Sequence, residues 1–381
     1  MKATGIVVEY NPLHFGHVHH IAETKRVSGA DVLIAVMSTH SVQRGEFSVA
    51  DKFEKTKWAL LAGVDLIVEL PGVFSLQNAD RFAYASVAIL EKLSCKEIVF
   101  GSESADIDNL RFIAEIMRTD AYSDALRNFL NEGTSYPTSA HNALQSLTGE
   151  TFSAGPNDIL AIQYIDALYA LQSEMVPRAI KRIDTEYYED FQENRKIQSA
   201  TSLRRRLQEG KSIKGYVPGY VQQTFEEKKP IFMEAFLPYI RYTLAKHDPK
   251  TLRRIFGFDE GLENLFLSAE GFHTFEDLVE TLASKRYTHS KVKRALMHAL
   301  LHVEKNDIVT FDPPYLRVLG MSGKGQKYLN EIKKDLDIPL ITKIKRERHR
   351  YLDLELRITK IYDLVAGASL YKREFQPLRK D

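Results

Sequence analysis

The chain has 381 residues, a formal net charge of +1 and 44% hydrophobic residues. Its length exceeds that of one ordinary domain, and its near-neutral charge excludes a protein that coats nucleic acid over its whole surface. The single cysteine, Cys95, excludes an internal disulfide framework and fits a reducing compartment. No apolar stretch approaches the roughly 20 residues that cross a bilayer. We therefore expect a soluble, cytoplasmic protein of two domains.

The first two hundred residues alternate between strand-like runs and segments of helical period. The strand-like runs are 3–8, 31–38, 64–70 and 97–101, and the helical segments between them include 51–62 and 78–93. This alternation predicts an α/β, Rossmann-like fold in which helices cover both faces of a parallel sheet. Ligands bind such sheets beyond the carboxyl ends of the strands. The loops expected at that edge are 10–17, 38–46, 69–71 and 101–103.

The later part of the chain has a different pattern. Residues 105–175 are predicted to be mostly helical, a last short strand is predicted at 178–184, and residues 215–381 give almost no strand signal. We place a boundary near residue 212. The expected organisation is an α/β domain of residues 1–212, followed by a mostly α-helical domain of residues 213–381.

Two histidines near the N-terminus suggest a phosphate site. A β-branched run ends near Tyr10, and a helix is expected to begin near Phe15 after a turn. The N-terminus of that helix presents free N–H groups and a positive dipole to an anion. His14 and His17 share one face of the first turn, so both can donate to one triphosphate, and Gly16 leaves room for a base or a phosphate. The alternative is that both histidines are surface or capping residues.

A second polar cluster precedes another expected helix. Residues 199–201 are a good N-cap cluster, and Arg204, Arg205 and Arg206 follow within two turns. Basic residues there oppose the helix dipole, so a negatively charged ligand would explain them. The alternative is a capped helix with a solvated basic face.

Two loops after strands leave their roles open. The turn Gln43-Arg44-Gly45-Glu46 either carries groups that contact substrate or is a plain turn with a solvated Arg–Glu pair. Gly101 lets a ribose or an adenine approach the backbone closely, or marks an ordinary turn at a strand end.

The motifs together resemble one protein family. H-F-G-H at 14–17 resembles the HxGH signature of the HIGH-type nucleotidyltransferases and class I aminoacyl-tRNA synthetases, and S-A-T-S-L-R at 199–204 resembles their second motif. With E-Y-N-P, Q-R-G-E, D-L-I-V-E-L-P, F-G-S-E and G-P-N-D-I-L in this order, the chain resembles the bacterial tRNA(Met) cytidine acetate ligases. That resemblance implies an ATP-dependent ligase that forms acetyl-adenylate and transfers the acetyl group to the N4 amine of the wobble cytidine of elongator tRNA(Met).

The resemblance also implies site residues. The predicted catalytic groups are His14, His17 and Arg204, with a Mg²⁺ ion held mainly by phosphates and water, because no carboxylate cluster has metal-ligand spacing. The implied ATP-binding residues are Val7, Val8, Glu9, Tyr10, Asn11, Pro12, Leu13, His14, Phe15, Gly16, His17, His20, Gly101, Asn157, Arg182 and Thr201. Asp158 stands where a second asparagine is common in the family, and we expect it to cap the helix that it precedes.

A tRNA substrate requires a basic surface. Residues 285–294 contain five cationic side chains and no acid, and the predicted tRNA-binding residues are Lys285, Arg286, Lys291, Lys293 and Arg294. Residues 343–350 form a second basic run, and both runs are alternatively solvated helix faces. His298 and His302 are expected to be core-edge histidines, because no third metal ligand accompanies them.

Two other functions compete with the ligase. A small-molecule adenylyltransferase acting on a phosphorylated metabolite would explain both motifs, but it leaves the large helical part and its basic segment without a role. A non-enzymatic nucleotide- or RNA-binding regulator would explain the fold alone, and the intact His14, Gly16 and His17 argue against it.

Overall fold

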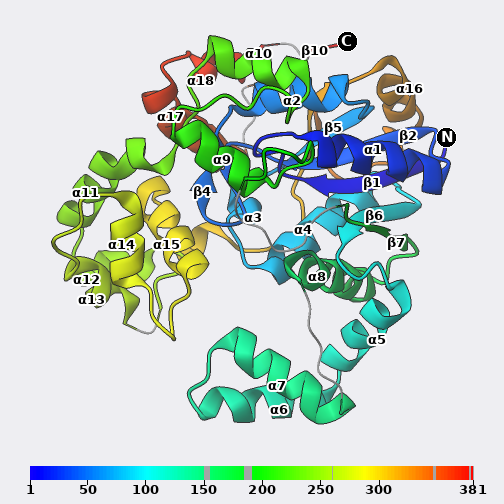
Figure 1. Cartoon of the computed structure of the whole chain (residues 1–381). Coiled ribbons are helices and arrows are strands. Elements are labelled where there is room, and N and C mark those ends of the chain that lie inside the picture. The colour runs from blue at the N-terminus through cyan, green and yellow to red at the C-terminus, as the bar shows by residue number, and fades with distance from the viewer. Residues whose placement is uncertain (150–154, 184–190, 260, 346–348, 377–378, 381) are drawn as a thin grey trace.

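The protein is built around one mixed, mostly parallel sheet (Figure 1). The computed structural model describes residues 1–149, 155–183, 191–259, 261–345, 349–376 and 379–380. The strand order is β10-β8-β5-β2-β1-β6-β7, with β9 paired to β8. The strands are β1 (Ala3–Val8), β2 (Val32–Ser38), β5 (Leu66–Leu70), β6 (Glu97–Ser102), β7 (Val176–Lys181), β8 (Leu316–Met321), β9 (Leu340–Ile341) and β10 (Arg379–Lys380). The predicted α/β class is confirmed.

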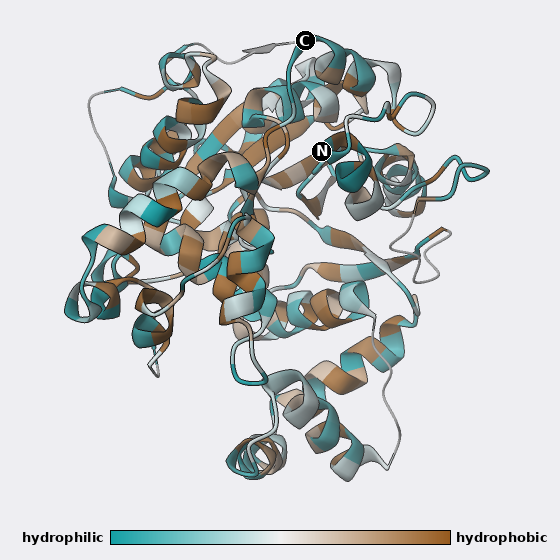
Figure 2. Ribbon diagram, turned by 60° about the vertical axis from the view of Figure 1, so that its left-hand side comes forward, coloured by the Kyte–Doolittle hydropathy of each residue, from teal (hydrophilic) through white to brown (hydrophobic). Residues whose placement is uncertain are grey.

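Alternate residues of the central strands enter two separate cores. Along β2, Val32, Ile34 and Val36 belong to one core cluster. The residues between them, Leu33 and Ala35, belong to the other cluster, as does Met37. Such alternation is expected of a strand buried on both faces. The first cluster contains α4 (Ala79–Lys92) and α8 (Pro156–Ala170), and the second contains residues of α1 (Phe15–Ser28) and α2 (Lys52–Leu61). Figure 2 shows the central strands as largely hydrophobic.

Two groups of helices extend from this sheet (Figure 1). One is an arm of three helices, α5 (Ile107–Met117), α6 (Asp120–Asn131) and α7 (Tyr136–Thr148). The other is a lobe made of α11 (Leu237–Lys246), α12 (Pro249–Arg254), α13 (Leu262–Leu267), α14 (Phe275–Leu282) and α15 (His289–Leu301). The remaining helices of four or more residues are α3 (Gly72–Ser75), α9 (Ala200–Gln208), α10 (Gly219–Glu227), α16 (Gly323–Ile332), α17 (Arg350–Ala366) and α18 (Leu370–Arg373). None of the helices in the described ranges has the length and apolar character that crossing a bilayer requires.

The C-terminal part returns to the central sheet, which the sequence did not predict. β8 pairs antiparallel with β5, with Leu66 opposite Met321 and Val68 opposite Val318. The run L-R-V-L-G-M lacks a clear strand signal because an arginine and a glycine interrupt its apolar residues. The boundary at residue 212 stays a prediction, and a division there separates β8 from its partner strand.

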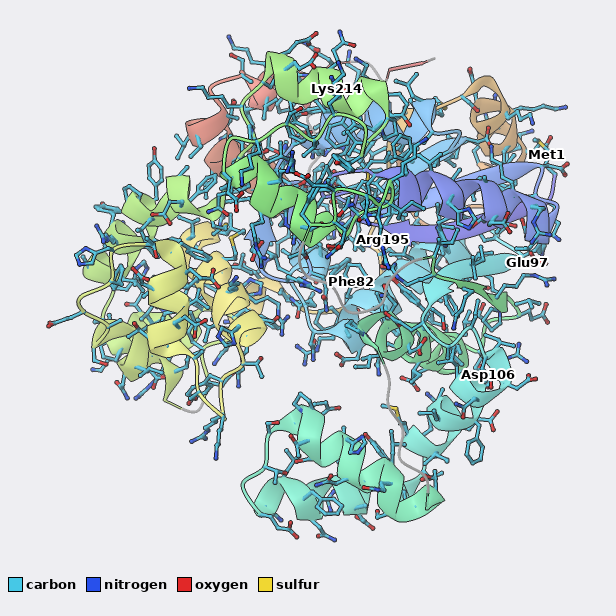
Figure 3. All side chains as sticks on the ribbon, viewed as in Figure 1. Met1, Phe82, Glu97, Asp106, Arg195 and Lys214 are labelled. Carbon is cyan, nitrogen blue, oxygen red and sulfur yellow. The ribbon has the colours of Figure 1, made fainter. Side chains whose placement is uncertain are left out.

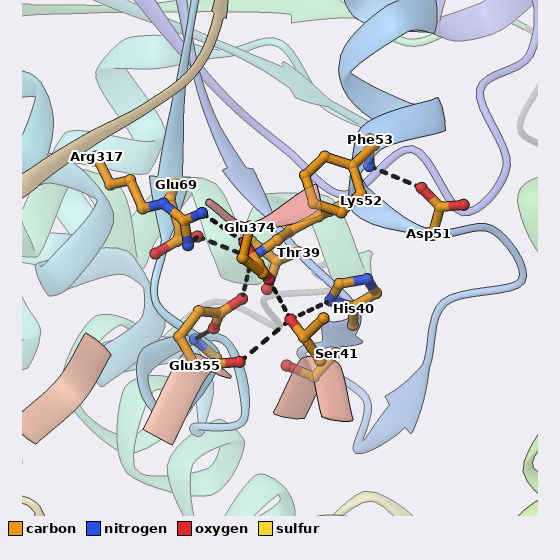
Figure 4. Close-up of polar contacts among 12 residues, drawn as sticks. Thr39, His40, Ser41, Asp51, Lys52, Phe53, Glu69, Arg317, Glu355 and Glu374 are labelled. Atoms are coloured by element: carbon orange, nitrogen blue, oxygen red, sulfur yellow. Dashed lines mark hydrogen bonds and ion pairs between the residues drawn. The ribbon is translucent and has the colours of Figure 1, made fainter. Parts of the chain in front are cut away.

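A buried cluster of charges joins α17, α18 and β8 to the N-terminal part (Figure 4). Lys52 Nζ lies 3.1 Å from Glu69 Oε2, 3.0 Å from Glu355 Oε1 and 2.8 Å from Glu374 Oε1. Arg317 contacts Glu69 at 2.9 Å and also pairs with Glu374. All five side chains are buried, so two cations face three carboxylates out of contact with water. Burial raises the pKa of Glu69 to about 7, and the neighbouring Glu355 and Glu374 add to the shift, although Arg317 and Lys52 oppose it.

Candidate active site

The first motif forms the turn between β1 and α1, at the carboxyl edge of the sheet. In Figure 3 this edge lies on the side of Arg195, whereas Met1 and Glu97 mark the opposite, amino-terminal edge. His14 is the N-cap of α1, and its Nδ1 accepts a hydrogen bond from the Gly16 N–H at 3.1 Å. His17 Nδ1 accepts from the His14 N–H at 3.2 Å, which completes a reciprocal capping box. Because both Nδ1 atoms are acceptors, a neutral ring carries its proton on Nε2 and can donate it to a ligand.

These two rings are neutral at physiological pH. Their centroids lie 3.8 Å apart. Burial lowers the pKa of His14 to about 3, and the nearby Arg182 and Arg204 lower it further. Burial and the neighbouring His14 hold the pKa of His17 well below its usual range. The histidines therefore act as N–H donors, and positive charge in the site comes from the arginines.

The second motif meets the first through Arg204. Ser199 caps α9, since its Oγ accepts from the Ser202 N–H at 3.0 Å. One turn later, Arg204 Nη1 donates to the carbonyl of Asn11 at 2.9 Å, and Nη2 donates to Thr201 Oγ1 at 3.2 Å. Burial lowers the pKa of this guanidinium, and the negative charge of Glu46 opposes that shift. The structure thus brings together the two motifs that lie far apart in the sequence.

A third group approaches from β6, β7 and the start of α8. Arg182 Nη1 donates to Asn157 Oδ1 at 3.4 Å, and a Cβ on Gly101 would lie 3.3 Å from Arg182 Cγ. Among the described residues, buried Arg182 Nε and His20 Nε2 have no hydrogen-bond partner. Arg182 also lowers the pKa of His20, which burial brings to about 4. Because buried polar atoms are nearly always paired, these two point to a polar ligand in the site.

The prediction that Asp158 caps its own helix is wrong. The N-cap of α8 is Gly155, and Asp158 lies in the first turn, where its carboxylate accepts from the Ser104 N–H at 3.1 Å and from the Ser102 hydroxyl. Glu103 caps the helix instead, accepting from the Asn157 N–H at 3.2 Å and from the Asp158 N–H at 2.8 Å. Sequence reasoning missed the capping role of Glu103, because a cap supplied by a loop distant in the sequence leaves no local signal.

The structure divides the five predicted tRNA-binding residues into two sets. Lys285 and Arg286 are exposed, and Arg286 and Lys291 lie over the ring of Tyr287. The other two hold a hairpin, β3 (Ser41–Val42) and β4 (Glu46–Phe47). Lys293 Nζ lies 2.9 Å from Glu46 Oε1, and Arg294 Nη1 donates to the Gln43 carbonyl at 3.3 Å. Glu46 therefore pairs with Lys293 and not with Arg44, and contact of this turn with substrate stays a prediction.

His298 and His302 lie at the C-terminal end of α15 in different environments. His298 is buried and its Nε2 lies 3.1 Å from the carbonyl of Leu76. His302 is the C-cap residue in the left-handed conformation. In the described ranges, no three His, Cys, Asp or Glu side chains are grouped as a metal site requires.

Comparisons with known proteins agree with this geometry. A family model described as HIGH Nucleotidyl Transferase matches residues 1–376. A tRNA(Met) cytidine acetate ligase of Geobacillus sp. (strain WCH70) is 37% identical over 92% of this chain and 90% of its own. The corresponding ligase of Bacillus subtilis (strain 168) is 36% identical over 96% of this chain and 92% of its own.

Solved structures give the same result. Crystal structures of Thermotoga maritima TmcAL, one apo and one bound with alpha-thio ATP, superpose over 100% of both chains with TM-scores of 0.90 and 0.89, at 29% sequence identity. The resemblance inferred from the sequence motifs is confirmed. The chain belongs to the HIGH nucleotidyltransferase family and, within it, to the tRNA(Met) cytidine acetate ligases.

Proposed function

We propose that this protein activates acetate with ATP and acetylates the N4 amine of the wobble cytidine in elongator tRNA(Met), in the cytoplasm. The observation that carries the proposal is the convergence of both motifs at one edge of the sheet, with Arg204 donating to the Asn11 carbonyl at 2.9 Å beside the stacked His14 and His17. The names of the relatives and the alpha-thio ATP bound to the Thermotoga maritima structure support the same reaction.

In the first step, an acetate oxygen attacks the α-phosphorus and the bond to the β-phosphate oxygen breaks, which releases pyrophosphate. Negative charge grows on the bridging oxygen and on the leaving group. In this proposal, the Nε2–H groups of His14 and His17 donate to these oxygens, and the nearby Arg204 and Arg182 supply positive charge. Donors fixed in a buried site stabilise such charge because they need no reorganisation during the reaction.

In the second step, the cytosine amine attacks the acyl carbon of acetyl-adenylate, AMP leaves and the amine loses a proton. A wobble base lies in a loop and can be splayed away from its neighbours into a pocket. We assign RNA binding to the helical region after residue 212, where Lys285 and Arg286 precede α15 and Lys291 lies in its first turn.

A magnesium ion fits this site only as a partner of the nucleotide. The donor groups gathered here are imidazoles, guanidiniums and backbone groups, and no carboxylate cluster among the described residues would form a cage. Mg²⁺ keeps several waters and binds readily to phosphates. When bound, it would neutralise charge on the leaving pyrophosphate, with the phosphates holding it.

The deciding experiment is ATP–pyrophosphate exchange, followed by nucleoside mass analysis of tRNA exposed to the protein. We expect exchange that depends on acetate and the appearance of N4-acetylcytidine. Exchange that depends on a phosphorylated metabolite would establish the small-molecule adenylyltransferase instead. No exchange with either compound would leave a nucleotide-binding regulator.

Two substitutions at His17 test the neutral-donor mechanism. His17→Ala removes a donor to developing charge, so we expect exchange to fall by roughly 10²–10³-fold with little change in tRNA binding. His17→Gln keeps a neutral N–H donor and should retain more exchange than the alanine variant. The matched control is His273→Ala, an exposed histidine before α14, which should exchange at the wild-type rate. Equal losses in both His17 variants would contradict the mechanism.

A further inference from the structure

The turn of the β3–β4 hairpin is held in place on three sides. Its backbone closes through the Gly45 N–H and the Val42 carbonyl at 3.0 Å. The Gln43 N–H donates to Glu9 Oε1 at 2.7 Å, directly after β1, and the Gln43 carbonyl accepts from Arg294 of α15. The turn therefore bridges the nucleotide site and α15, the helix whose first turns belong to the predicted RNA-binding segment.

Contact between this turn and α15 leaves no room for a side chain at Gly45. A Cβ there would lie 2.5 Å from the Arg294 backbone nitrogen, and Gly45 has a φ of +84°. The turn thus packs directly on the helix backbone. On the other strand of the hairpin, Phe47 is buried and Glu46 is bound by Lys293 at 2.9 Å. Every neighbour of Arg44 in the turn is consequently fixed.

Arg44 itself has a different environment. Its side chain is exposed, and within the ranges that the structure describes no ion pair joins it to a carboxylate. The acid nearest in sequence, Glu46, is already paired with Lys293. Burial lowers the pKa of Arg204, and Arg44 is close enough to lower it further. Glu46 and Glu9 offset part of the positive charge around Arg204. The exposed Arg44 guanidinium, on a rigid turn, remains available for a two-pronged contact with a phosphate.

We infer that Arg44 binds a backbone phosphate of the RNA substrate at the entrance to the nucleotide site. The inference rests on the proposed function and adds a residue to it. An RNA phosphate is favoured over the triphosphate because Arg44 is exposed, whereas the other predicted phosphate ligands, His14 and Arg182 among them, are mostly buried. Its turn also contacts Glu9 after β1 and the backbone of Lys293 and Arg294 in α15, so Arg44 belongs to a turn that touches both the nucleotide site and the predicted RNA-binding residues.

The test compares the two half-reactions in the full-length protein. For Arg44→Ala we expect the KM for tRNA to rise about tenfold, while acetate-dependent ATP–pyrophosphate exchange stays within about twofold of wild type. The slope of log(kcat/KM) for tRNA against log[salt] should become shallower by about 0.7, the value for one phosphate contact on a single strand. Arg44→Lys should fall between, because it keeps the charge and loses the two-pronged contact. The matched control is Arg127→Ala on α6, an exposed arginine that pairs with Asp124 one turn away.

Two results would overturn the inference. A loss of exchange equal to the loss of acetyl transfer would place Arg44 on the triphosphate. An unchanged KM and salt slope for tRNA would show that Arg44 does not contact RNA. Failure of the proposed function itself is distinguishable from both, because the wild-type protein would then show no acetate-dependent exchange.

Discussion

Replacing Lys52 with methionine tests whether the buried charge cluster stabilises the fold through charge. Methionine keeps most of the side-chain volume, so the main loss is the ammonium group that contacts Glu69, Glu355 and Glu374 at 2.8–3.1 Å. The variant leaves three buried carboxylates facing Arg317 alone. Removing one partner from a buried ion pair costs about 3–5 kcal/mol, a large part of a typical unfolding free energy of about 5–15 kcal/mol.

The penalty should depend on pH with a definite sign. In the wild type, burial raises the pKa of Glu69 from 4.5 to about 7, so the folded state binds the extra proton more tightly than the unfolded chain. The stability gained from this proton on Glu69 is fully present below the unfolded pKa of 4.5 and is lost as the pH rises to about 7. Without Lys52 the carboxylates hold protons more tightly still, so that loss continues above pH 7. Each pH unit in this window is worth up to about 1.4 kcal/mol per proton.

The assay is urea unfolding, followed by circular dichroism, at pH 6 and pH 8. We expect Lys52→Met to be destabilised at both values and by about 1–3 kcal/mol more at pH 8. Lys57→Met, a lysine of the same helix outside the cluster, is the control and should change stability by less than about 0.5 kcal/mol. A penalty for Lys52→Met that is the same at both pH values would refute the charge argument and leave packing as the cause.

Two further predictions concern the site and the hairpin. Burial lowers the pKa of His14 to about 3 and of His20 to about 4, so both rings bind a proton below about pH 6.5 only after the protein unfolds. The stability of the fold should therefore fall as the pH drops from 6.5 toward 4. The measurement is the number of protons taken up on unfolding. Exchange activity should show no inflection near pH 6.5 from these rings. Gly45→Ala forces a Cβ to within 2.5 Å of the Arg294 nitrogen, so the hairpin must shift, and transfer to tRNA should fall more than ATP–pyrophosphate exchange. Equal falls in both rates would mean that the hairpin serves the nucleotide site alone.

Elements with strong local signals were predicted well from the sequence. The four strands expected at 3–8, 31–38, 64–70 and 97–101 match β1, β2, β5 and β6 within two residues at each end. Their β-branched and apolar residues, in short runs of strand length, are typical of buried strands. The motif around His14 was also readable, because a strand, a turn and a helix start are all local features. The sequence predicted that both motifs bind one nucleotide, but not the contact between Arg204 and the Asn11 carbonyl, because no sequence pattern gives a distance.

Features that depend on distant partners were missed. β8 was hidden because Arg317 and Gly320 break its apolar run, and Arg317 is buried only because Glu69 and Glu374 neutralise it. The β3–β4 hairpin has two-residue strands, too short for a period-two pattern. The charge of Lys293 was evident, but no local pattern could reveal that its partner, Glu46, lies 247 residues earlier in the chain.

The late position of β8 has a consequence for synthesis. β5 ends at Leu70, but the strand that covers its free side, Leu316–Met321, leaves the ribosome only after most of the chain has been translated. At roughly 5–20 residues per second, the interval is on the order of ten to fifty seconds. During that time the nascent chain exposes an apolar strand edge, which is a template for pairing with another chain. The exposed edge of β5 is therefore covered only when β8 becomes available late in translation, and until then the nascent chain is prone to aggregate.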